Sequence, residues 1–346
     1  MKKALVTGGT GHVGLNLLKR LNQEKRPVRV LLAPGTSLPE DIDAEVVLGD
    51  IRDYDAMRKA CEGVETVFHL AGIISITGAQ GGRVWDVNVN GTEATARAAL
   101  DSGVKRFVHV SSIHAFDINT YPDREVTEAA SRPTKAHPFY DQSKSAGEDR
   151  VRDLISRGLD AVIVNPTGII GPYDMAPSRM GRLFLDLFKD GLSFLVDNGF
   201  NWVDVRDVVD GILGAEAKGK TGENYILSGH WHSMVELARL AEEARGLAIS
   251  RIVLPTWTVY LAIPILALLS KFTKKEPLVT KDSLHAVRGS HKISYQKAAA
   301  ELDYQPRATK ETVKAIYESF VKLGQIPKAK QISKKVAPPS SSIHLV

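Results

Sequence analysis

Cysteine is almost missing from the sequence, since Cys61 stands alone among 346 residues. A single cysteine excludes an intrachain disulfide and cannot build a zinc site by itself, so we expect a reducing compartment and no metal site. The first residues, MKKALVTGG, run out of apolar side chains too early for a secretory signal peptide. We therefore expect a cytoplasmic protein whose first strand begins almost at once.

Long apolar segments are also scarce. The candidate runs from Leu254 to Leu269 and is interrupted by Pro264 and two threonines. A spanning helix needs about 20 mostly apolar residues, so a buried helix is the favoured interpretation. A helix lying in a membrane surface, with the lysines that follow among the headgroups, remains the less favoured alternative.

Neither sign of charge dominates, because 45 basic residues face 40 acidic ones and the formal net charge is +5. The basic residues are scattered, apart from KAKQISKK near the C-terminus, so we expect no nucleic-acid partner. Residues 327–346 are basic and then rich in proline and serine. That composition predicts a flexible tail.

Short apolar runs alternate with helix-like segments up to residue 172. Continuous Val/Ile/Leu strands between helices predict a doubly wound α/β fold of the Rossmann type, with helices on both faces of a parallel sheet. The alternation returns briefly at 199–228. We expect a cofactor domain of 1–172 plus 199–228 and a smaller, mostly helical substrate lobe of 173–198 and 229–326. The predicted strands are KALVTG, VRVLLA, AEVVLGD, ETVFHLAG, KRFVHVSS and DAVIVNP.

The first strand leads directly into TGGTGHVG, which places Gly8, Gly11 and Gly14 three residues apart at the start of a helix. Glycines there allow a tight turn and a close approach to a pyrophosphate, whose charge the helix N-terminus stabilises. A glycine triplet alone can be a simple turn, but the strand-to-helix context favours dinucleotide binding. Thr10, His12 and Val13 belong to the same predicted cofactor loop.

The usual residue that selects the cofactor is absent after the second strand. An acid there binds the ribose hydroxyls of NAD and an arginine accommodates the phosphate of NADP, whereas this sequence has Leu32 and Ala33. NAD or NADP is expected, with a slight preference for NADP because no carboxylate repels its phosphate. In GDIRD, Asp50 and Ile51 are predicted to contact the adenine, although Asp50 could equally cap the next helix.

The segment YDQSK places Tyr140 and Lys144 four residues apart, which stacks them on one face if the segment is helical. They can then act on the same small molecule. The pattern alone is more often an amphipathic surface helix. Its neighbours in the sequence therefore decide what it indicates.

Those neighbours carry a family resemblance. TGGTGHVG, GDIRD, VFHLAG, NVNGT, VHVSS, YDQSK and NPTGIIGP occur in the order and spacing of the extended short-chain dehydrogenases/reductases, the NAD-dependent epimerase/dehydratase family. The resemblance covers about residues 1–325 and is strongest to members like dihydroflavonol reductase and 3β-hydroxysteroid dehydrogenase. It implies an NAD(P)-dependent oxidoreductase with a small-molecule substrate, and a homodimer.

The resemblance also implies the catalytic residues. Tyr140 exchanges a proton with the substrate hydroxyl, and Lys144 holds the nicotinamide ribose and lowers the pKa of the phenol. Ser112 donates to the substrate carbonyl, while its neighbour Ser111 points to the other face of the strand. The alternative for Ser112 is a strand-end serine that caps a turn.

Further cofactor contacts follow from the same motifs. The backbone after the fourth strand would lie along the cofactor, Asn88 would support the lysine, and the loop at 166–169 would flank the carboxamide. Each of these has a simpler alternative. The segment after the fourth strand could be only a buried strand with a glycine turn, and Asn88 could only satisfy a helix backbone. The loop at 166–169 could be an ordinary loop that begins with a Pro/Gly pair. The residues are Leu70, Ala71, Gly72, Asn88, Pro166, Thr167 and Ile169.

Two absences narrow the reaction. Sugar dehydratases of the family have acids after the strand-end serine, where this chain has Ile113 and His114. Nucleotide-sugar enzymes tend to carry an arginine where this chain has Phe200. A lone histidine such as His114 is more often a hydrogen-bonded surface or cavity residue than an acid/base. Arg179 and Arg206 are candidate anion contacts, but solvated or salt-bridged arginines are the favoured alternative. The candidates for lining an apolar pocket are Ile74, Ile76, Phe139, Tyr173, Met175, Met180 and Trp202.

The favoured function is hydride transfer between nicotinamide and a ketone or alcohol of an apolar small molecule. A sugar or nucleotide-sugar epimerase with tightly bound NAD remains an alternative, since it would use the same side chains. A non-catalytic sensor of the NADP redox state is the alternative from another class. An intact Ser112, Tyr140 and Lys144 set argues against the sensor, which needs no proton transfer.

Overall fold

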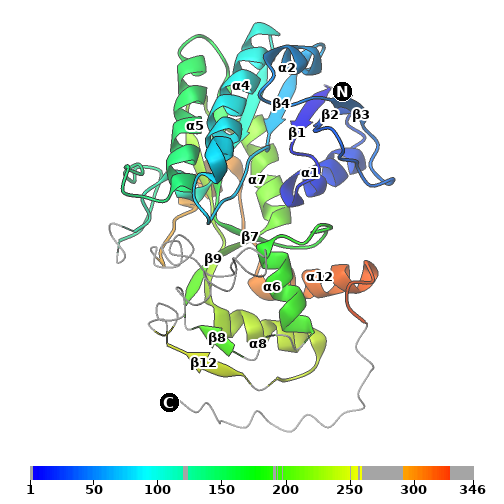
Figure 1. Cartoon of the computed structure of the whole chain (residues 1–346), viewed down its shortest axis with the longest axis vertical. Helices are drawn as coiled ribbons and strands as arrows, with labels where there is room; N and C mark the ends of the chain where they lie inside the picture. Colours follow the sequence, from blue (N-terminus) through cyan, green and yellow to red (C-terminus); the bar gives the residue numbers. More distant parts are fainter. Residues whose placement is uncertain are drawn as a thin grey trace.

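The computed structural model describes residues 3–119, 124–189, 192, 194–196, 198–249, 251–255, 258 and 291–327. Its centre is a seven-stranded parallel sheet in the order β10-β6-β5-β4-β1-β2-β3 (Figure 1). All six predicted strands form, and the doubly wound fold class is confirmed. The strands are β1 (Ala4–Thr7), β2 (Val28–Leu32), β3 (Glu45–Leu48), β4 (Thr66–His69), β5 (Arg106–Val110), β6 (Ala161–Pro166) and β10 (Asn224–Leu227).

Helices cover both faces of this sheet, as buried parallel strands require. One face packs against α1 (His12–Gln23) and α7 (Val205–Lys218), which bury Leu17, Leu21 and Ile212 against it. The other face packs against α2 (Tyr54–Cys61), α4 (Thr92–Asp101) and α5 (Phe139–Ile155). Because all seven strands run in one direction, their carboxyl ends form a single edge, where ligands of such folds bind.

The helix that precedes α4 is irregular. The short α3 (Arg83–Trp85) runs into a π-helical segment at Asp86–Gly91 before α4 begins. A Cβ atom at Gly91 would lie 2.7 Å from Ile51 Cδ1, so this segment packs closely against the loop after β3. π-helical turns inside helices often occur at functional sites, and this one carries Asn88.

Smaller elements gather beyond the carboxyl edge of the sheet, at the other end of the long axis in Figure 1. A three-stranded sheet joins β7 (Gly168–Ile170), β9 (Gly199–Asp204) and β11 (His230–Ser233), and a pair joins β8 (Phe194–Val196) to β12 (Ile252–Leu254). A third apolar core lies among α6 (Arg179–Phe188), α8 (Met234–Arg245) and α12 (Thr309–Lys322). The helix α11 (Gln296–Leu302) packs instead beside α7 and β10.

Two predictions fall largely outside the described residues. Only Leu254, Pro255 and Thr258 of the apolar run are described, and the predicted tail lies beyond residue 327. Within the described part of the chain, no helix is both long enough and apolar enough to span a bilayer.

Candidate active site

The glycine loop has little room for larger side chains. Gly8 has a φ of +75°, and a Cβ atom there would lie 2.7 Å from the amide nitrogen of Ala71. A Cβ atom at Gly14 would lie 2.2 Å from the Gly8 oxygen. Thr10 and Gly11 are exposed at the start of α1, and Gly11 is its N-cap with no side-chain cap bond. The loop therefore presents backbone N–H groups at a helix N-terminus, which suits a pyrophosphate.

His12 and Val13 have mainly structural side chains. His12 Nε2 lies 3.0 Å from the carbonyl oxygen of Pro172, and Asn16 Nδ2 donates to the same oxygen at 3.1 Å. Val13 packs partly buried against the core beneath α1. These contacts fix the cofactor loop to the segment after β7, and the backbone of both residues stays available at the start of the helix.

The ends of β2 and β3 form the predicted adenosine side. Ala33 is exposed, and Thr36 closes a turn by donating its N–H and hydroxyl to the Ala33 oxygen. Asp50 is paired with Arg52, whose Nη2 donates to Oδ2 at 2.6 Å and whose Nε donates to Oδ1 at 3.0 Å. The alternative role for Asp50 is wrong, because the cap of α2 is Asp53. Arg52 was not anticipated.

Ser112, Tyr140 and Lys144 come together at the carboxyl end of β5. Ser112 follows that strand, hydrogen-bonds Tyr140, and accepts from the His114 N–H at 3.2 Å. Lys144 Nζ donates to the carbonyl oxygen of Val110 at 3.2 Å and is buried. Ser112 therefore caps the turn at Ile113–Ala115 and also faces the phenol, while its donation to a substrate carbonyl stays a prediction.

The pKa values of Lys144 and Tyr140 differ in part from the expectation that the lysine lowers the pKa of the phenol. Burial lowers the pKa of Lys144 to about 8, and the charge of Glu148 opposes that shift. Burial raises the pKa of Tyr140 to about 12, the bond with Ser112 opposes it, and Asp141 adds to it. Lys144 thus does not bring the phenol near neutral pH in this state. Tyr140 therefore keeps its proton at neutral pH in this state.

Asn88 ties the loop after β4 to α5. Its Oδ1 accepts from the Ile73 N–H at 2.8 Å, while Nδ2 donates to the Ile73 oxygen and to Ser143 Oγ, each at 3.0 Å. None of these partners belongs to the backbone of its own helix, so the alternative that Asn88 only satisfies a helix backbone is wrong. A Cβ atom at Gly72 would lie 3.3 Å from Asn88 Oδ1 and 3.9 Å from Lys144 Nζ. Gly72, Asn88 and Lys144 therefore converge.

The strand ends on either side complete the crevice. Leu70 and Ala71 lie beside the end of β1, where their N–H groups donate to the Thr7 oxygen and hydroxyl. Pro166 ends β6, Ile169 packs against the sheet core, and Thr167 bonds to β10 through its N–H. Thr167 Oγ1 is buried and has no hydrogen-bond partner among the described residues. An unpaired buried hydroxyl is costly, which fits a polar ligand group at this point.

A buried polar chain beneath these residues was not predicted. His69 Nδ1 lies 2.9 Å from Thr7 Oγ1 and its Nε2 lies 3.0 Å from Thr92 Oγ1. Thr92 donates to the Asn88 oxygen at 2.9 Å, so Nε2 carries the imidazole proton and Nδ1 accepts from Thr7. Burial lowers the pKa of His69 to about 3. His109 stacks on this ring with centroids 5.5 Å apart. The only sequence signal was a histidine inside an apolar strand.

Comparison with known proteins decides the family. Residues 4–228 match the model of the NAD-dependent epimerase/dehydratase family. The chain belongs to this family. It is 35% identical to sterol demethylase protein B of Methylococcus capsulatus over 253 residues, which cover 72% of this chain and 77% of the relative. It is 32% identical to a putative dihydroflavonol 4-reductase of Synechocystis, covering 73% and 75%.

A solved structure shares the whole architecture of this epimerase/dehydratase-family enzyme. The crystal structure of gox2253 superimposes with a TM-score of 0.80 at 29% identity, covering 94% of this chain and all of that one. The predicted resemblance is thereby confirmed. The protein is an NAD(P)-dependent enzyme of the extended short-chain type.

The substrate side of this family member is only partly as predicted. Phe200 stacks on the His114 ring at 6.2 Å, and His114 in turn meets the Tyr140 ring edge-on at 5.7 Å. His114 Nδ1 also lies 3.2 Å from the buried carboxylate of Asp141, although without good hydrogen-bond geometry. His114 therefore borders the phenol of Tyr140, and Phe200 packs on His114.

The other residues predicted for the pocket lie in several parts of the fold. Trp202 and Met180 belong to the core among α6, α8 and α12. Arg206 forms a fork with Asp204, with Nη2 to Oδ2 at 2.6 Å, so the favoured alternative of a salt-bridged arginine is confirmed there. Ile74 is exposed, Ile76 is half-buried, Phe139 packs on Trp85, and Arg179 begins α6.

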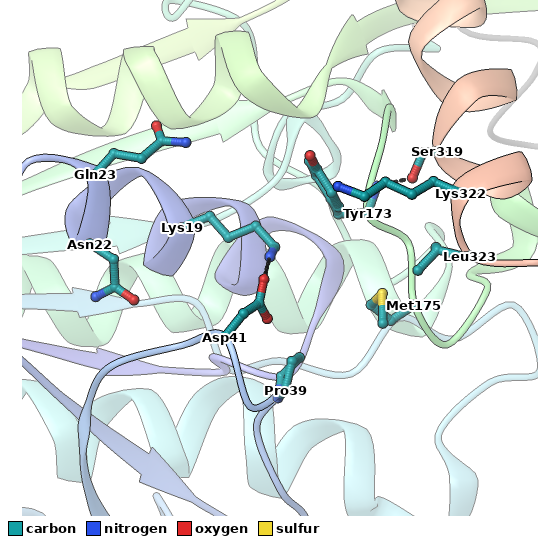
Figure 2. Close-up of a pocket in the computed structure, with 10 residues that line it drawn as sticks. All are labelled: Lys19, Asn22, Gln23, Pro39, Asp41, Tyr173, Met175, Ser319, Lys322 and Leu323. Atoms are coloured by element: carbon teal, nitrogen blue, oxygen red, sulfur yellow. Dashed lines mark hydrogen bonds and ion pairs between the residues drawn. The ribbon is translucent and has the colours of Figure 1, made fainter.

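Tyr173 and Met175 line another cavity, of about 620 Å³, shown in Figure 2. It lies between α1, residues 39–41, the segment after β7 and the end of α12, and no catalytic side chain borders it. Lys19 pairs with Asp41 and lies 4.9 Å from the centre of the Tyr173 ring. The φ of Tyr173 is +60°, and its backbone N–H donates to Ser319 Oγ on α12 at 2.9 Å.

Proposed function

We propose that this enzyme transfers a hydride between the nicotinamide of NAD(P) and a ketone or alcohol of an apolar small molecule. The observation that carries the proposal is the meeting of Ser112, Tyr140 and Lys144 at the end of β5, on the same sheet edge as the glycine loop. A proton donor and a hydride carrier are both needed to reduce a carbonyl. This edge supplies the proton donor, and the glycine loop at the same edge suits the pyrophosphate of the hydride carrier.

The residues present fit a dinucleotide. Gly8 and Gly14 let the loop pack closely, the exposed Thr10 and Gly11 stand at the start of α1 where a pyrophosphate would bind, and the unpaired hydroxyl of Thr167 can serve a carboxamide. Lys144 can donate to ribose hydroxyls, because its ammonium has three donors and Val110 accepts only one. When bound, the cofactor supplies or accepts the hydride. The predicted contacts with adenine at Asp50 and Ile51 remain part of this proposal.

The protonation states favour reduction of a carbonyl. Burial raises the pKa of Tyr140 to about 12, so the phenol carries its proton at neutral pH and can give it to a carbonyl oxygen. Ser112, which bonds to that phenol, can donate to the same oxygen as negative charge develops. In the reverse direction Tyr140 must first lose its proton, which requires higher pH or the positive charge of an oxidised nicotinamide.

An apolar substrate is supported by two positions near the phenol. Phe200, which packs on His114, is apolar where nucleotide-sugar enzymes tend to carry an arginine, and no acid follows Ser112 directly, so elimination of water lacks the carboxylates that a dehydratase uses. The relatives named above, a sterol demethylase protein and a putative dihydroflavonol reductase, carry names of polycyclic apolar compounds. We infer a substrate of that class.

The preference between NAD and NADP is proposed to lean toward NADP. The exposed turn after β2 offers only neutral groups, Ala33, Thr36 and Ser37. With no carboxylate there to repel it, the extra phosphate of NADP can approach. The division into a cofactor domain and a substrate lobe, and the homodimer, also remain predictions.

The test is titration with NADH and NADPH, followed by a screen of steroid-like ketones, flavonoid ketones, aldehydes and UDP-sugars by nicotinamide absorbance. We expect oxidation of reduced cofactor with an apolar ketone and none with UDP-sugars. Purified protein that retains NAD and interconverts sugars would support the epimerase instead. Cofactor binding without turnover of any carbonyl compound would support a sensor.

A further inference from the structure

Glu148 is a buried carboxylate that the catalytic scheme does not use. It lies on α5 four residues after Lys144 and eight after Tyr140, so all three lie on one face of the helix. Its side chain has no exposed surface. A buried charge is costly unless it is paired and hydrogen-bonded, so its partners are informative.

Those partners come from several parts of the fold. Glu148 Oε1 accepts from Asn165 Nδ2 at 2.6 Å, and Oε2 accepts from Asn224 Nδ2 at 3.0 Å and Arg132 Nη1 at 2.7 Å. Arg152 Nη2 lies 3.7 Å from Oε2. The carboxylate therefore joins α5 to β6, to β10 and to the loop that precedes the helix.

One of these partners reaches the catalytic serine. Asn165 Nδ2 donates not only to Glu148 but also to the carbonyl oxygen of Ser112, at 3.0 Å. Asn165 Oδ1 accepts from Asn224 Nδ2 at 2.8 Å, which fixes the orientation of the amide. The backbone of Ser112 is thus held through Asn165 by the carboxylate.

The same charge acts on Lys144. Glu148 is the group that opposes the effect of burial on the pKa of Lys144. The other titratable side chains packed around the lysine are Tyr140 on α5, His69 on β4 and His109 on β5, and burial keeps both imidazoles uncharged at neutral pH. Arg132 and Arg152 stand near Glu148, and the carboxylate of Asp149 lies near Arg132 at the helix surface.

We propose that Glu148 is a positioning residue with two tasks: it is the buried counter-charge of the Lys144 ammonium, and through Asn165 it holds Ser112 against Tyr140. Only the catalytic meaning of this arrangement rests on the proposed function. The coupling between Glu148 and Lys144 is a property of the protein itself, and it can be measured without a substrate.

The test follows the Lys144 side chain by NMR in protein with ¹³C-labelled lysine, with Lys144→Arg used to assign the signal. In Glu148→Gln we expect the pKa of Lys144 to fall by about one to three pH units, the usual effect of losing a close opposite charge. Asp149→Asn is the matched control, because it removes a negative charge from the adjacent residue at the helix surface. We expect the pKa of Lys144 in Asp149→Asn to be the same as in the wild type.

The second task predicts a kinetic effect on any ketone that the wild-type enzyme reduces. Glu148→Gln should lower kcat and move the alkaline limb of the pH profile to lower pH, with the KM for reduced cofactor nearly unchanged. Glu148→Asp keeps the negative charge, so its alkaline limb should lie close to that of the wild type. A purely structural role would depend on side-chain length, and Glu148→Asp would then be as impaired as Glu148→Gln.

A folded Glu148→Gln protein in which Lys144 titrates as in the wild type would overturn the proposal. If Glu148→Gln does not fold, the wild-type titration decides. A Lys144 pKa near 8 supports the counter-charge, whereas a pKa of about 5 to 6, as found for buried lysines without one, would exclude it. Failure to find a reducible ketone would count against the proposed function and leave this result standing.

Discussion

Lys144 Nζ lies 3.2 Å from the carbonyl oxygen of Val110, which binds the helix of the catalytic phenol to the strand that ends just before Ser112. This bond uses one of the three donors of the ammonium. It explains how groups more than 30 residues apart in the sequence keep a fixed geometry at one sheet edge. The account therefore depends on Lys144 staying charged.

The pH dependence of activity follows from that charge. Burial lowers the pKa of Lys144 to about 8, so the ammonium is present below that pH and is lost as the pH rises through it. We expect kcat/KM for ketone reduction to be level near pH 7 and to fall up to tenfold per pH unit above about 8. Lys144→Arg should show low activity without this limb, since arginine stays protonated. A wild-type profile that is flat to pH 10 would contradict the assignment.

Cofactor preference should respond to the exposed position Ala33. Ala33→Arg places a cation where the phosphate of NADP is expected, and a charge-assisted hydrogen bond is worth about 1.5–3 kcal/mol, or about tenfold to a hundredfold in affinity. Ala33→Asp should weaken NADPH and spare NADH. Fluorescence titration with both cofactors measures the ratio of the affinities for NADPH and NADH, and unfolding temperatures check that these surface changes leave the fold intact. If this ratio is unchanged in both variants, the adenine ribose does not bind beside Ala33.

The glycine loop makes a graded prediction. A Cβ atom at Gly14 would lie 2.2 Å from the Gly8 oxygen, so Gly14→Ala forces the loop or α1 to move. Overpacking of this kind costs about 1–3 kcal/mol of stability, and we expect at least tenfold weaker cofactor binding. Gly11→Ala is the comparison, because its Cβ would stand 3.3 Å from the same oxygen and its φ is −75°. Equal effects of the two changes on binding would contradict the packing argument.

The buried His69 should make the fold sensitive to acid. Burial lowers its pKa to about 3 from an ordinary value of 6.5, so the unfolded chain binds the extra proton between these values. The contribution of His69 to the free energy of unfolding is therefore fully present above about pH 6.5. It decreases as the pH drops toward 3, by at most about 1.4 kcal/mol per pH unit for one group. Urea unfolding at pH 7, 6 and 5 measures this slope.

A variant separates His69 from general acid effects. His69→Phe should be less stable at pH 7, because the hydroxyls of Thr7 and Thr92 lose their partner, and it should show a shallower slope. His230→Gln, at a half-buried position on β11, is the matched control. An identical slope in wild type and His69→Phe would show that another group governs acid unfolding.

Local patterns in the sequence were enough for much of the fold and of the catalytic set. The six strands were predictable because buried parallel strands are continuous apolar runs, and the glycine loop because its spacing is fixed by a turn. The spacing of Tyr140 and Lys144 predicted that they share a helix face, because four residues span about one helical turn. Their catalytic role was predicted only from the resemblance of the surrounding motifs to one family.

What could not be predicted depends on contacts between distant segments. Glu148 meets Asn165 and Asn224, which lie 17 and 76 residues away, so its spacing from Lys144 alone gave no reason to assign it a role. Tyr173 was predicted for the apolar pocket, but it lines the cavity between α1 and α12, where its ring lies near Lys19 and its N–H donates to Ser319.

The most direct test of the central claim compares wild type with Tyr140→Phe. Reduced cofactor is mixed with an apolar ketone found in the screen, and nicotinamide absorbance is followed over time. We expect turnover to fall about 10²- to 10⁴-fold in Tyr140→Phe, with cofactor affinity nearly intact, because only the proton donor is lost. Tyr54→Phe, at the surface of α2, should behave as the wild type. Activity that survives in Tyr140→Phe would contradict the account.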